Sequence, residues 1–296
     1  MTRELVDFVA AELAEPVDPR VAAMAEALAA QYGGAARTVL FYGSCLRAGE
    51  LDGLMLDFYL IVSSYRAAYG KSWLAAANRL IPPNVFPFTH NVLTAKFAVL
   101  SEEDMLRECG PDARSVSVWA RFAQPARMVW AANAGAASDT VASIALAAPT
   151  LLCFALPLGG SEPRDVLDVW KRGFSMTYGA ELRAERSDRS ASIVDADPER
   201  YSRFGQAALR GIDRMRLPDA QVTADMWKRM QRRGKRLSVL RLAKASFTFA
   251  GGIDYLAWKV SRHSGVPVVI RPWHRRAPLI AALFLLPRLL TRGAIR

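Results

Sequence analysis

The alternation of apolar and polar stretches predicts strands in the first part of the chain and helices throughout. Three short apolar runs have the length of strands and stop at turn residues or acids, as buried strands do. These runs are Thr38–Tyr42, Met55–Val62 and Val92–Leu100. Apolar residues at helical spacing predict helices at Leu5–Leu13, Arg20–Tyr32 and Tyr65–Leu80. The predicted fold class is α+β, with a mixed sheet covered by helices.

Capping residues mark several element boundaries. Asp18 followed by Pro19 is a strong helix start, and Gly33-Gly34 ends the same helix. Ser101 is followed by three acids, a pattern that caps a helix and favours its dipole. Two further segments are predicted without caps: Asn84–Phe88 as irregular or extended, and Arg127–Trp130 as a short strand.

From Ser138 onward the pattern is helical. Thr140–Leu158 is almost wholly apolar and has about the length of one membrane span. Because Pro149 interrupts it and Ala dominates it, we predict two buried helices, broken at Pro149, and not a membrane span. Further helices are predicted from Ser161 to Thr177 and over Tyr201–Met215. The predicted domains are residues 1–135 with the sheet, residues 136–225 mainly helical, and residues 226–296 as a basic C-terminal region.

Charge is distributed unevenly along the chain. The formal net charge is +11, and the segment from Lys228 to the end holds 16 Lys and Arg residues against one acid, Asp254. Subtracting these from the totals of 39 and 28 leaves 23 basic and 27 acidic residues in residues 1–227, a net charge near −4. A basic region on an acidic body predicts an anionic partner, either a membrane surface or nucleic acid. The three cysteines lack metal-ligand spacing, which suits a reducing compartment.

The C-terminal region, residues 226–296, favours the membrane surface. Ala277–Leu286 is apolar, too short to span, and flanked by Trp273 and arginines, which suits a helix lying among lipid headgroups. The alternative is a terminal helix docked on the core. Nucleic acid is not expected, because the basic residues alternate with aliphatic side chains and not with base-stacking aromatics. Acids from Glu4 onward argue against a signal or transit peptide, so we predict a peripheral protein on the cytoplasmic face of the inner membrane.

Candidate chemistry lies where the first two predicted strands meet a turn. The first strand stops at Gly43-Ser44, a pair that lets the backbone bend tightly and present N–H groups to a phosphate. Asp57 is the one acid in Met55–Val62, and a buried carboxylate is costly without a partner. We therefore expect Asp57 near a strand end, facing a cation. A Gly-Ser bend followed by a strand acid is typical of nucleotidyltransferases, in which the bend holds a triphosphate and the acid binds Mg²⁺.

Seven motifs, in order over about 210 residues, resemble one family, the mitochondrial-type CDP-diacylglycerol synthases. Members of this family are peripheral phosphatidate cytidylyltransferases with a nucleotidyltransferase domain, a winged-helix-like domain and a basic membrane-binding region. The motifs are Phe41-Tyr-Gly-Ser44, Arg47-Ala-Gly49, Met55-Leu-Asp-Phe58, the strand Leu93–Val99 with Lys96, Arg121-Phe-Ala-Gln-Pro125, Tyr178-Gly-Ala-Glu-Leu-Arg183 and Ala243-Lys-Ala-Ser-Phe-Thr-Phe-Ala-Gly-Gly252.

The resemblance implies that phosphatidic acid attacks the α-phosphorus of CTP and that pyrophosphate leaves, with Mg²⁺ as the metal. It implies a catalytic set of Asp57, Lys96 and Glu181. Asp57 and Glu181 are the implied metal ligands, with Asp52 and Glu50 as weaker candidates, because Tyr59 occupies the position where nucleotidyltransferases usually carry a second acid. The residues implied to bind nucleotide or lipid phosphates are Tyr42, Gly43, Ser44, Arg47, Arg121, Arg183 and Lys244.

Each assignment has a structural alternative, and the motifs depart from the family in places. The alternatives are an edge-strand or snorkelling Lys96, a surface Arg121, a solvent-facing Arg47, a Glu181–Arg183 ion pair and a packing role for Tyr42. The departures are Cys45 in place of Gly, Ala123-Gln-Pro-Ala without the family's Lys, Glu181 in place of Asp, and a segment, Tyr65–Asn84, that matches the family poorly.

Three rival functions remain open. The first is nucleotidyl transfer that uses another lipid phosphate or another nucleotide. The second is an inactive protein of the membrane surface, and the third is a nucleic-acid-binding protein.

Overall fold

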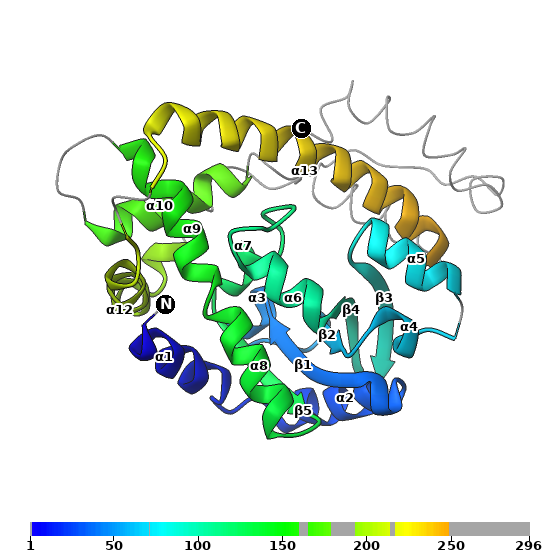
Figure 1. Ribbon diagram of the computed structural model, residues 1–296. Coiled ribbons are helices and arrows are strands. Elements are labelled where there is room, and N and C mark those ends of the chain that lie inside the picture. Colours follow the sequence, from blue (N-terminus) through cyan, green and yellow to red (C-terminus); the bar gives the residue numbers. More distant parts are fainter. Residues whose placement is uncertain (1, 71, 160–164, 179–192, 214–216, 249–296) are drawn as a thin grey trace.

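The computed structural model describes residues 2–70, 72–159, 165–178, 193–213 and 217–248. Within these residues the chain forms an α+β fold built on a five-stranded mixed sheet with helices on both faces (Figure 1). The strands are β1 (Ala36–Tyr42), β2 (Met55–Val62), β3 (Asn84–His90), β4 (Leu93–Ser101) and β5 (Ala126–Ala131). The predicted fold class is confirmed.

The sheet has the strand order β3-β4-β2-β1-β5. β2 and β4 pair in parallel, and the other neighbours pair antiparallel. The three strands predicted from apolar runs are confirmed as β1, β2 and β4. Asn84–Phe88, predicted to be irregular or extended, is part of the edge strand β3. An edge strand accommodates Pro87 because its missing N–H faces no neighbour on the open side.

The two faces of β2 belong to two cores. Leu56, Phe58 and Leu60 pack in the cluster that contains the buried side of α2 (Pro19–Ala30). Tyr59 and Ile61 pack in the cluster on the opposite face. Because both faces are covered, the strand is apolar without alternation, and a single acid in it stands out.

The first part of the chain, residues 2–131, contains two helices with the predicted N-caps. The helix predicted to end at Gly33-Gly34 ends earlier, at Ala30, and Gly33 begins a 3₁₀ helix. The Asp18 side chain accepts a hydrogen bond from the Arg20 N–H at 2.8 Å, and the Ser101 hydroxyl accepts one from the Asp104 N–H at 3.2 Å. The remaining elements are α1 (Arg3–Leu13), the 3₁₀ helix η1 (Gly33–Ala35), α3 (Ser44–Ala48), α4 (Tyr65–Ala68), α5 (Ser72–Leu80), α6 (Glu102–Cys109) and α7 (Trp119–Phe122).

The single helix predicted over Tyr65–Leu80 is wrong, because α4 and α5 are separate. Tyr69 has an extended backbone and its ring is buried in the core under the sheet. Gly70 follows it, and glycine costs a helix interior about 1 kcal/mol relative to alanine. The free energy gained by burying the Tyr69 ring therefore exceeds the free energy that would be gained by continuing the helix through Tyr69 and Gly70.

The second part of the chain, from Ala134 onward, is helical in its described residues. Its elements are α8 (Ala134–Ile144), α9 (Ala147–Ala155), η2 (Leu156–Gly159), α10 (Val166–Tyr178), α12 (Pro198–Arg210) and α13 (Ala220–Thr248). Two helices form within Thr140–Leu158 as predicted, but the predicted break at Pro149 is wrong. The break falls at Ala145-Leu146, and Pro149 lies in the first turn of α9, where its missing N–H is tolerated.

One segment of the described chain, Ala134–Gly159, is long and apolar enough to cross a membrane by length and composition alone. Half of its most apolar window is buried inside the protein. Ala136, Ile144 and Leu151 are among its buried residues. The core helices of many proteins satisfy the same test.

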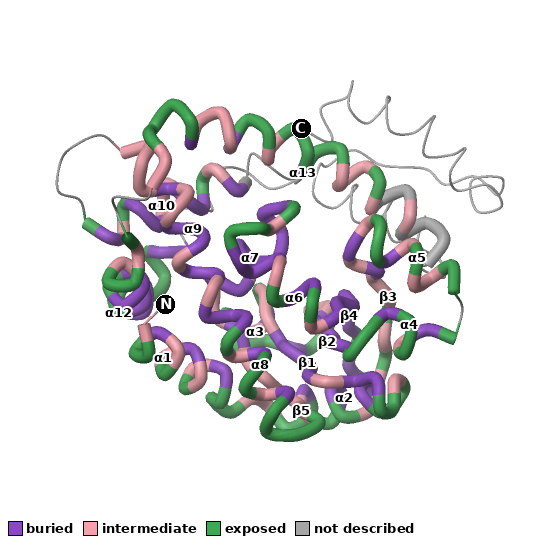
Figure 2. Tube along the Cα trace, viewed as in Figure 1, coloured by how far each residue is buried: buried purple, intermediate pink, exposed green. Residues whose placement is uncertain are grey.

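One buried cluster joins the sheet to the helices of the second part. It contains Tyr59 and Trp119 from the first part together with Leu151, Trp170 and Trp227. Trp227 lies on α13, which runs across the molecule to the β3 edge of the sheet (Figure 1). Much of the α13 surface is exposed (Figure 2). The predicted boundary at residue 226 falls inside this helix, and residues 249–296 lie outside the described chain.

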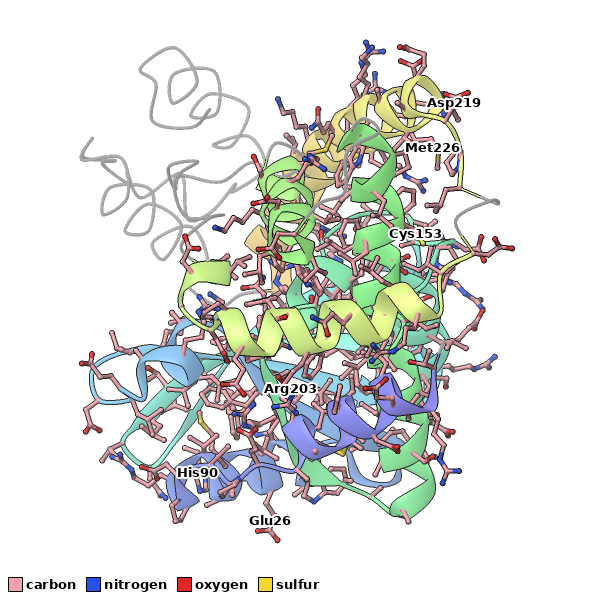
Figure 3. All side chains as sticks on the ribbon, turned by 90° about the vertical axis from the view of Figure 1, so that its left-hand side faces the viewer. Glu26, His90, Cys153, Arg203, Asp219 and Met226 are labelled. Carbon is pink, nitrogen blue, oxygen red and sulfur yellow. The ribbon has the colours of Figure 1, made fainter. Side chains whose placement is uncertain are left out.

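A buried ion pair joins α1 to α12, the two helices that lie next to each other in Figure 3. The Arg200 guanidinium forms a bidentate pair with the Glu12 carboxylate, at 2.9 Å for one of the two bonds. It also donates to the Ala123 carbonyl at 3.1 Å and lies over the Phe204 ring. Arg203, labelled in Figure 3, lies over the Phe8 ring at the same junction.

Candidate functional site

The bend after β1 is held against a carboxylate. Gly43 has φ 96° and ψ −159°, a backbone conformation essentially restricted to glycine. A Cβ added at Gly43 would lie 2.9 Å from Asp57 Oδ2, so only glycine fits beside this side chain. α3 begins at the next residue, Ser44, which is exposed. The acid of the second strand and the Gly-Ser bend are therefore direct neighbours.

Asp57 is paired with a cation, as the sequence predicts. In the parallel register of β2 and β4, Asp57 lies opposite Lys96, and Lys96 Nζ is 3.0 Å from Asp57 Oδ1. The Asp57 side chain is 17% exposed and that of Lys96 is 28% exposed. β4 is an interior strand, so the alternative of an edge-strand lysine is wrong.

A cavity of about 160 Å³ lies between the sheet and the segments that cover it. The sheet contributes Tyr42, Tyr59 and Lys96 to its lining. The chain segments that cover the sheet contribute Ser117, Arg121, Arg241 and Lys244. Four of the predicted phosphate-binding or catalytic residues, from four different elements, thus line one space: Tyr42, Lys96, Arg121 and Lys244.

Helix α13 forms one wall of the cavity through two cations. Arg241 donates to the Pro82 carbonyl and to the Ser117 hydroxyl, both at 2.7 Å. Lys244 donates to the carbonyls of Ile81 and Pro83. Burial, followed by the charge of Arg241, lowers the pKa of Lys244 to about 7.

The other predicted residues occupy different surroundings. The Tyr42 ring packs on Tyr59 and Phe122 with centroid distances of 5.2 and 6.1 Å, so its packing alternative also holds. Arg121 donates to the Ser117 carbonyl. Arg47 is exposed, donates to the Gln124 side chain at 3.2 Å and lines a different cavity beside α1 and α12. Glu181 and Arg183 lie outside the described residues.

Among the residues that line the cavity, Arg241 and Ser117 were not predicted from the sequence. Arg241 belongs to the basic C-terminal region, and Ser117 lies in a stretch without a clear pattern. A signal for Arg241 does exist in the sequence, because it precedes Lys244 by three residues and α13 therefore presents both on one face.

Cys45, which departs from the family motif, is buried behind the bend. Its thiol donates to the Met55 carbonyl at 3.5 Å and packs in the core under β2. Burial, followed by the charge of Asp57, raises the pKa of this thiol.

The donors around Asp57 fit Mg²⁺ in part. Among the described residues, no group of three or more His, Cys, Asp or Glu side chains is arranged to hold a metal ion. Mg²⁺ is often held by one or two carboxylates together with substrate phosphates, so a single acid beside a phosphate-binding bend suits an ion that arrives with a nucleotide. Asp52 is an unsuitable second ligand because it pairs with Arg20 at 2.8 Å and is largely exposed.

Comparison with protein-family models and with curated proteins finds no match for this chain. The resemblance to a known family rests on the seven motifs alone, and the geometry of the bend, the ion pair and the cavity is the evidence for an activity.

Proposed function

We propose that this protein is a Mg²⁺-dependent nucleotidyltransferase that transfers the cytidylyl group of CTP to phosphatidic acid and releases pyrophosphate. The observation that carries the proposal is the contact of Asp57 with both Gly43 and Lys96 at one edge of a cationic cavity. Both substrates of such a reaction are polyanions, so neutralisation and alignment of charge matter more than a covalent nucleophile.

The residues have separate tasks in this proposal. The first N–H groups of α3, which have no partner within the helix, receive oxygens of the triphosphate. Lys96 balances charge between the nucleotide and the acceptor. Asp57 would hold Mg²⁺, which would supply charge stabilisation to the triphosphate and to the leaving pyrophosphate. The motifs that resemble the CDP-diacylglycerol synthases support CTP and phosphatidic acid as the substrates.

The test is a substrate panel that reads pyrophosphate release. Each of the four nucleoside triphosphates is supplied with Mg²⁺ in mixed micelles, with and without phosphatidic acid. Release is expected with CTP and only when phosphatidic acid is present. Release with another nucleotide or another lipid phosphate would keep the reaction type and replace the substrate. No release with any pair would favour the inactive membrane-surface protein.

Replacement of Gly43 by alanine should disable the site through contact with Asp57. The substitution Gly43→Ala is expected to cost about 1–3 kcal/mol of stability from backbone strain. It is also expected to reduce pyrophosphate release, because the new Cβ would displace the Asp57 carboxylate. Gly49→Ala is the matched control, since Gly49 also has a positive φ, 69°, but nothing within 4 Å of the added Cβ. An equal loss of activity in both variants would contradict the role given to the Gly43–Asp57 contact.

The basic C-terminal region is proposed to bind an anionic membrane surface. Removal of residues 273–296 is expected to weaken sedimentation with liposomes that contain phosphatidic acid, and most strongly at low salt. Each Lys or Arg near an anionic surface contributes about 1 kcal/mol, and salt screens this attraction. Liposomes of neutral lipid are the control. Unchanged sedimentation of the truncated protein would assign the segment a structural role instead.

A further inference from the structure

Helix α5 carries an exposed apolar face. Trp73 and Leu80 are large hydrophobic residues and are 52% and 77% exposed. Together with Ala76, which is also exposed, they have the spacing i, i+3 and i+7 and therefore share one face of the helix. Another face is anchored to the sheet by the buried Asn78, which donates to the Val99 carbonyl at 3.0 Å. The anchored helix thus directs its tryptophan outward.

Helix α13 carries an exposed cationic face. At 3.6 residues per turn, six exposed basic residues fall within about 160° of its circumference. They are Lys228, Arg229, Arg232, Arg233, Lys235 and Arg236. Lys228 pairs with the exposed Asp225, and the other five form no ion pair with any residue that the structure describes. A surface of this kind attracts an anionic partner.

The two faces adjoin near the end of α13. Leu240, four residues after Arg236 and 48% exposed, continues the exposed side of α13. One turn further, Lys244 donates to the carbonyls of Ile81 and Pro83, which come directly after α5. Accordingly, α5 lies beside this part of α13 (Figure 1). The row of cations therefore leads through Leu240 to the apolar face of α5.

We propose that α5 and the cationic face of α13 dock the folded part of the protein on an anionic lipid bilayer, with Trp73 and Leu80 inserted among the headgroups. Tryptophan is amphipathic and favours the level of the headgroups, and the α13 cations attract lipid phosphates. The inference goes beyond the proposed reaction, because docking needs no nucleotide. It also goes beyond the family resemblance and the C-terminal segment 273–296, because α5 lies in Tyr65–Asn84, the segment that matches the family poorly.

The make-up of this surface favours a bilayer over a protein partner. A stable protein–protein interface buries about 800 Å² on each partner, whereas one tryptophan and one leucine supply on the order of 400 Å². A helix at a bilayer surface needs only an apolar face with cations beside it, and anionic lipid complements the whole cationic face of α13. Docking in this way also brings Pro83, which lines the cavity under α13, close to the bilayer.

Sedimentation of the full chain with vesicles tests the apolar face without turnover. The vesicles contain equal parts of phosphatidylcholine and phosphatidylglycerol, so that the proposed lipid substrate is absent. Trp73→Gln and Leu80→Gln are each expected to weaken binding about tenfold. Leu106→Gln and Val92→Gln are the matched controls, because these residues are 52% and 81% exposed but lie on α6 and in the β3–β4 turn. Equal weakening by both pairs overturns the proposal.

The cationic face is tested by a double variant, Arg232→Gln with Arg236→Gln. It is expected to weaken binding to the same vesicles about 30-fold at low salt and less at high salt. Arg3→Gln with Arg210→Gln is the control, because it removes two exposed charges from α1 and α12. Thermal melting establishes that each variant is folded. Equal weakening by the two double variants would come from net charge and overturns the proposal.

Fluorescence quenching reads the contact of Trp73 with lipid directly. Bromine atoms on lipid acyl chains quench the emission of a tryptophan that touches them. Wild-type protein and Trp73→Phe are compared on vesicles with and without brominated lipid. The Trp73→Phe protein is expected to lose part of the quenching seen in the wild type. Equal quenching of the two proteins overturns the proposal, because other tryptophans would then make the contact.

Measurements without vesicles separate the bilayer from other occupants of this face. Shielding of the Trp73 emission from dissolved iodide would assign the face to residues 249–296 of the same chain. A mass that rises with concentration, and that Trp73→Gln restores to that of the monomer, would assign it to a second copy. Either result overturns the proposal.

Two results separate this inference from the proposed function. Loss of all vesicle binding on removal of residues 273–296, with no effect of the α5 variants, retains the C-terminal segment and overturns the α5 surface. Docking that depends on Trp73, in a wild-type protein that releases no pyrophosphate, rejects the transferase function and supports the docking surface.

Discussion

Asp57→Asn is expected to reduce pyrophosphate release from CTP in the presence of phosphatidic acid by at least about 100-fold, because it removes the charge proposed to hold Mg²⁺. Asparagine has nearly the same shape as aspartate, so the contact with Gly43 and the packing of β2 are retained. The substitution also deprives Lys96 of its 3.0 Å partner. Initial rates at saturating CTP and Mg²⁺ measure the effect, and thermal melting checks that the fold is intact.

Asp52→Asn is the matched control for this experiment. Asp52 lies in the turn before β2, is exposed, and pairs with Arg20 at the surface. Its substitution is expected to leave the rate within about twofold of the wild type, because exposed ion pairs contribute little. A folded Asp57→Asn protein with near-wild-type activity would remove Asp57 from the catalytic set, and with it the mechanism proposed for this site.

Arg200→Met is expected to lower the free energy of unfolding by about 3–5 kcal/mol, because it leaves the buried Glu12 carboxylate without its partner. The pair is well enclosed, with side-chain exposures of 8% for Arg200 and 13% for Glu12. The variant also loses the hydrogen bond to the Ala123 carbonyl. Denaturant unfolding measures the change through the midpoint at constant slope.

The same two helices provide a control and a rescue. Arg210 of α12 pairs with Glu4 of α1, and both side chains are about half exposed, at 53% and 45%. Arg210→Met is expected to cost at most about 1 kcal/mol. Adding Glu12→Gln to Arg200→Met removes the unpaired charge and should recover part of the loss. An Arg200→Met effect no larger than that of Arg210→Met would mean that the buried pair does not stabilise the α1–α12 junction.

The sheet could be predicted in part from local patterns. β2 matches its predicted bounds, Met55–Val62, because a strand buried on both faces is a continuous apolar run. For β3 the sequence predicted only an irregular or extended segment at Asn84–Phe88, because one face of this strand is partly solvated and Pro87 interrupts its pattern. The division of Tyr65–Leu80 into α4 and α5 was missed because Gly70 is only a weak local signal, while the burial of Tyr69 in the core depends on the tertiary structure.

Two features of the site follow from the amino-acid sequence alone: Asp57 needs a cation, and the first strand ends just before Gly43. Both conclusions follow from short-range physics: the cost of an isolated buried charge and the conformational freedom of glycine. The identity of the cation that meets Asp57 depends on the fold, since the parallel register of β2 and β4 brings Lys96 opposite it. Only the tertiary structure placed Ser117 and Arg241 on the same cavity, because chain segments more than 100 residues apart meet there through packing and not through sequence proximity.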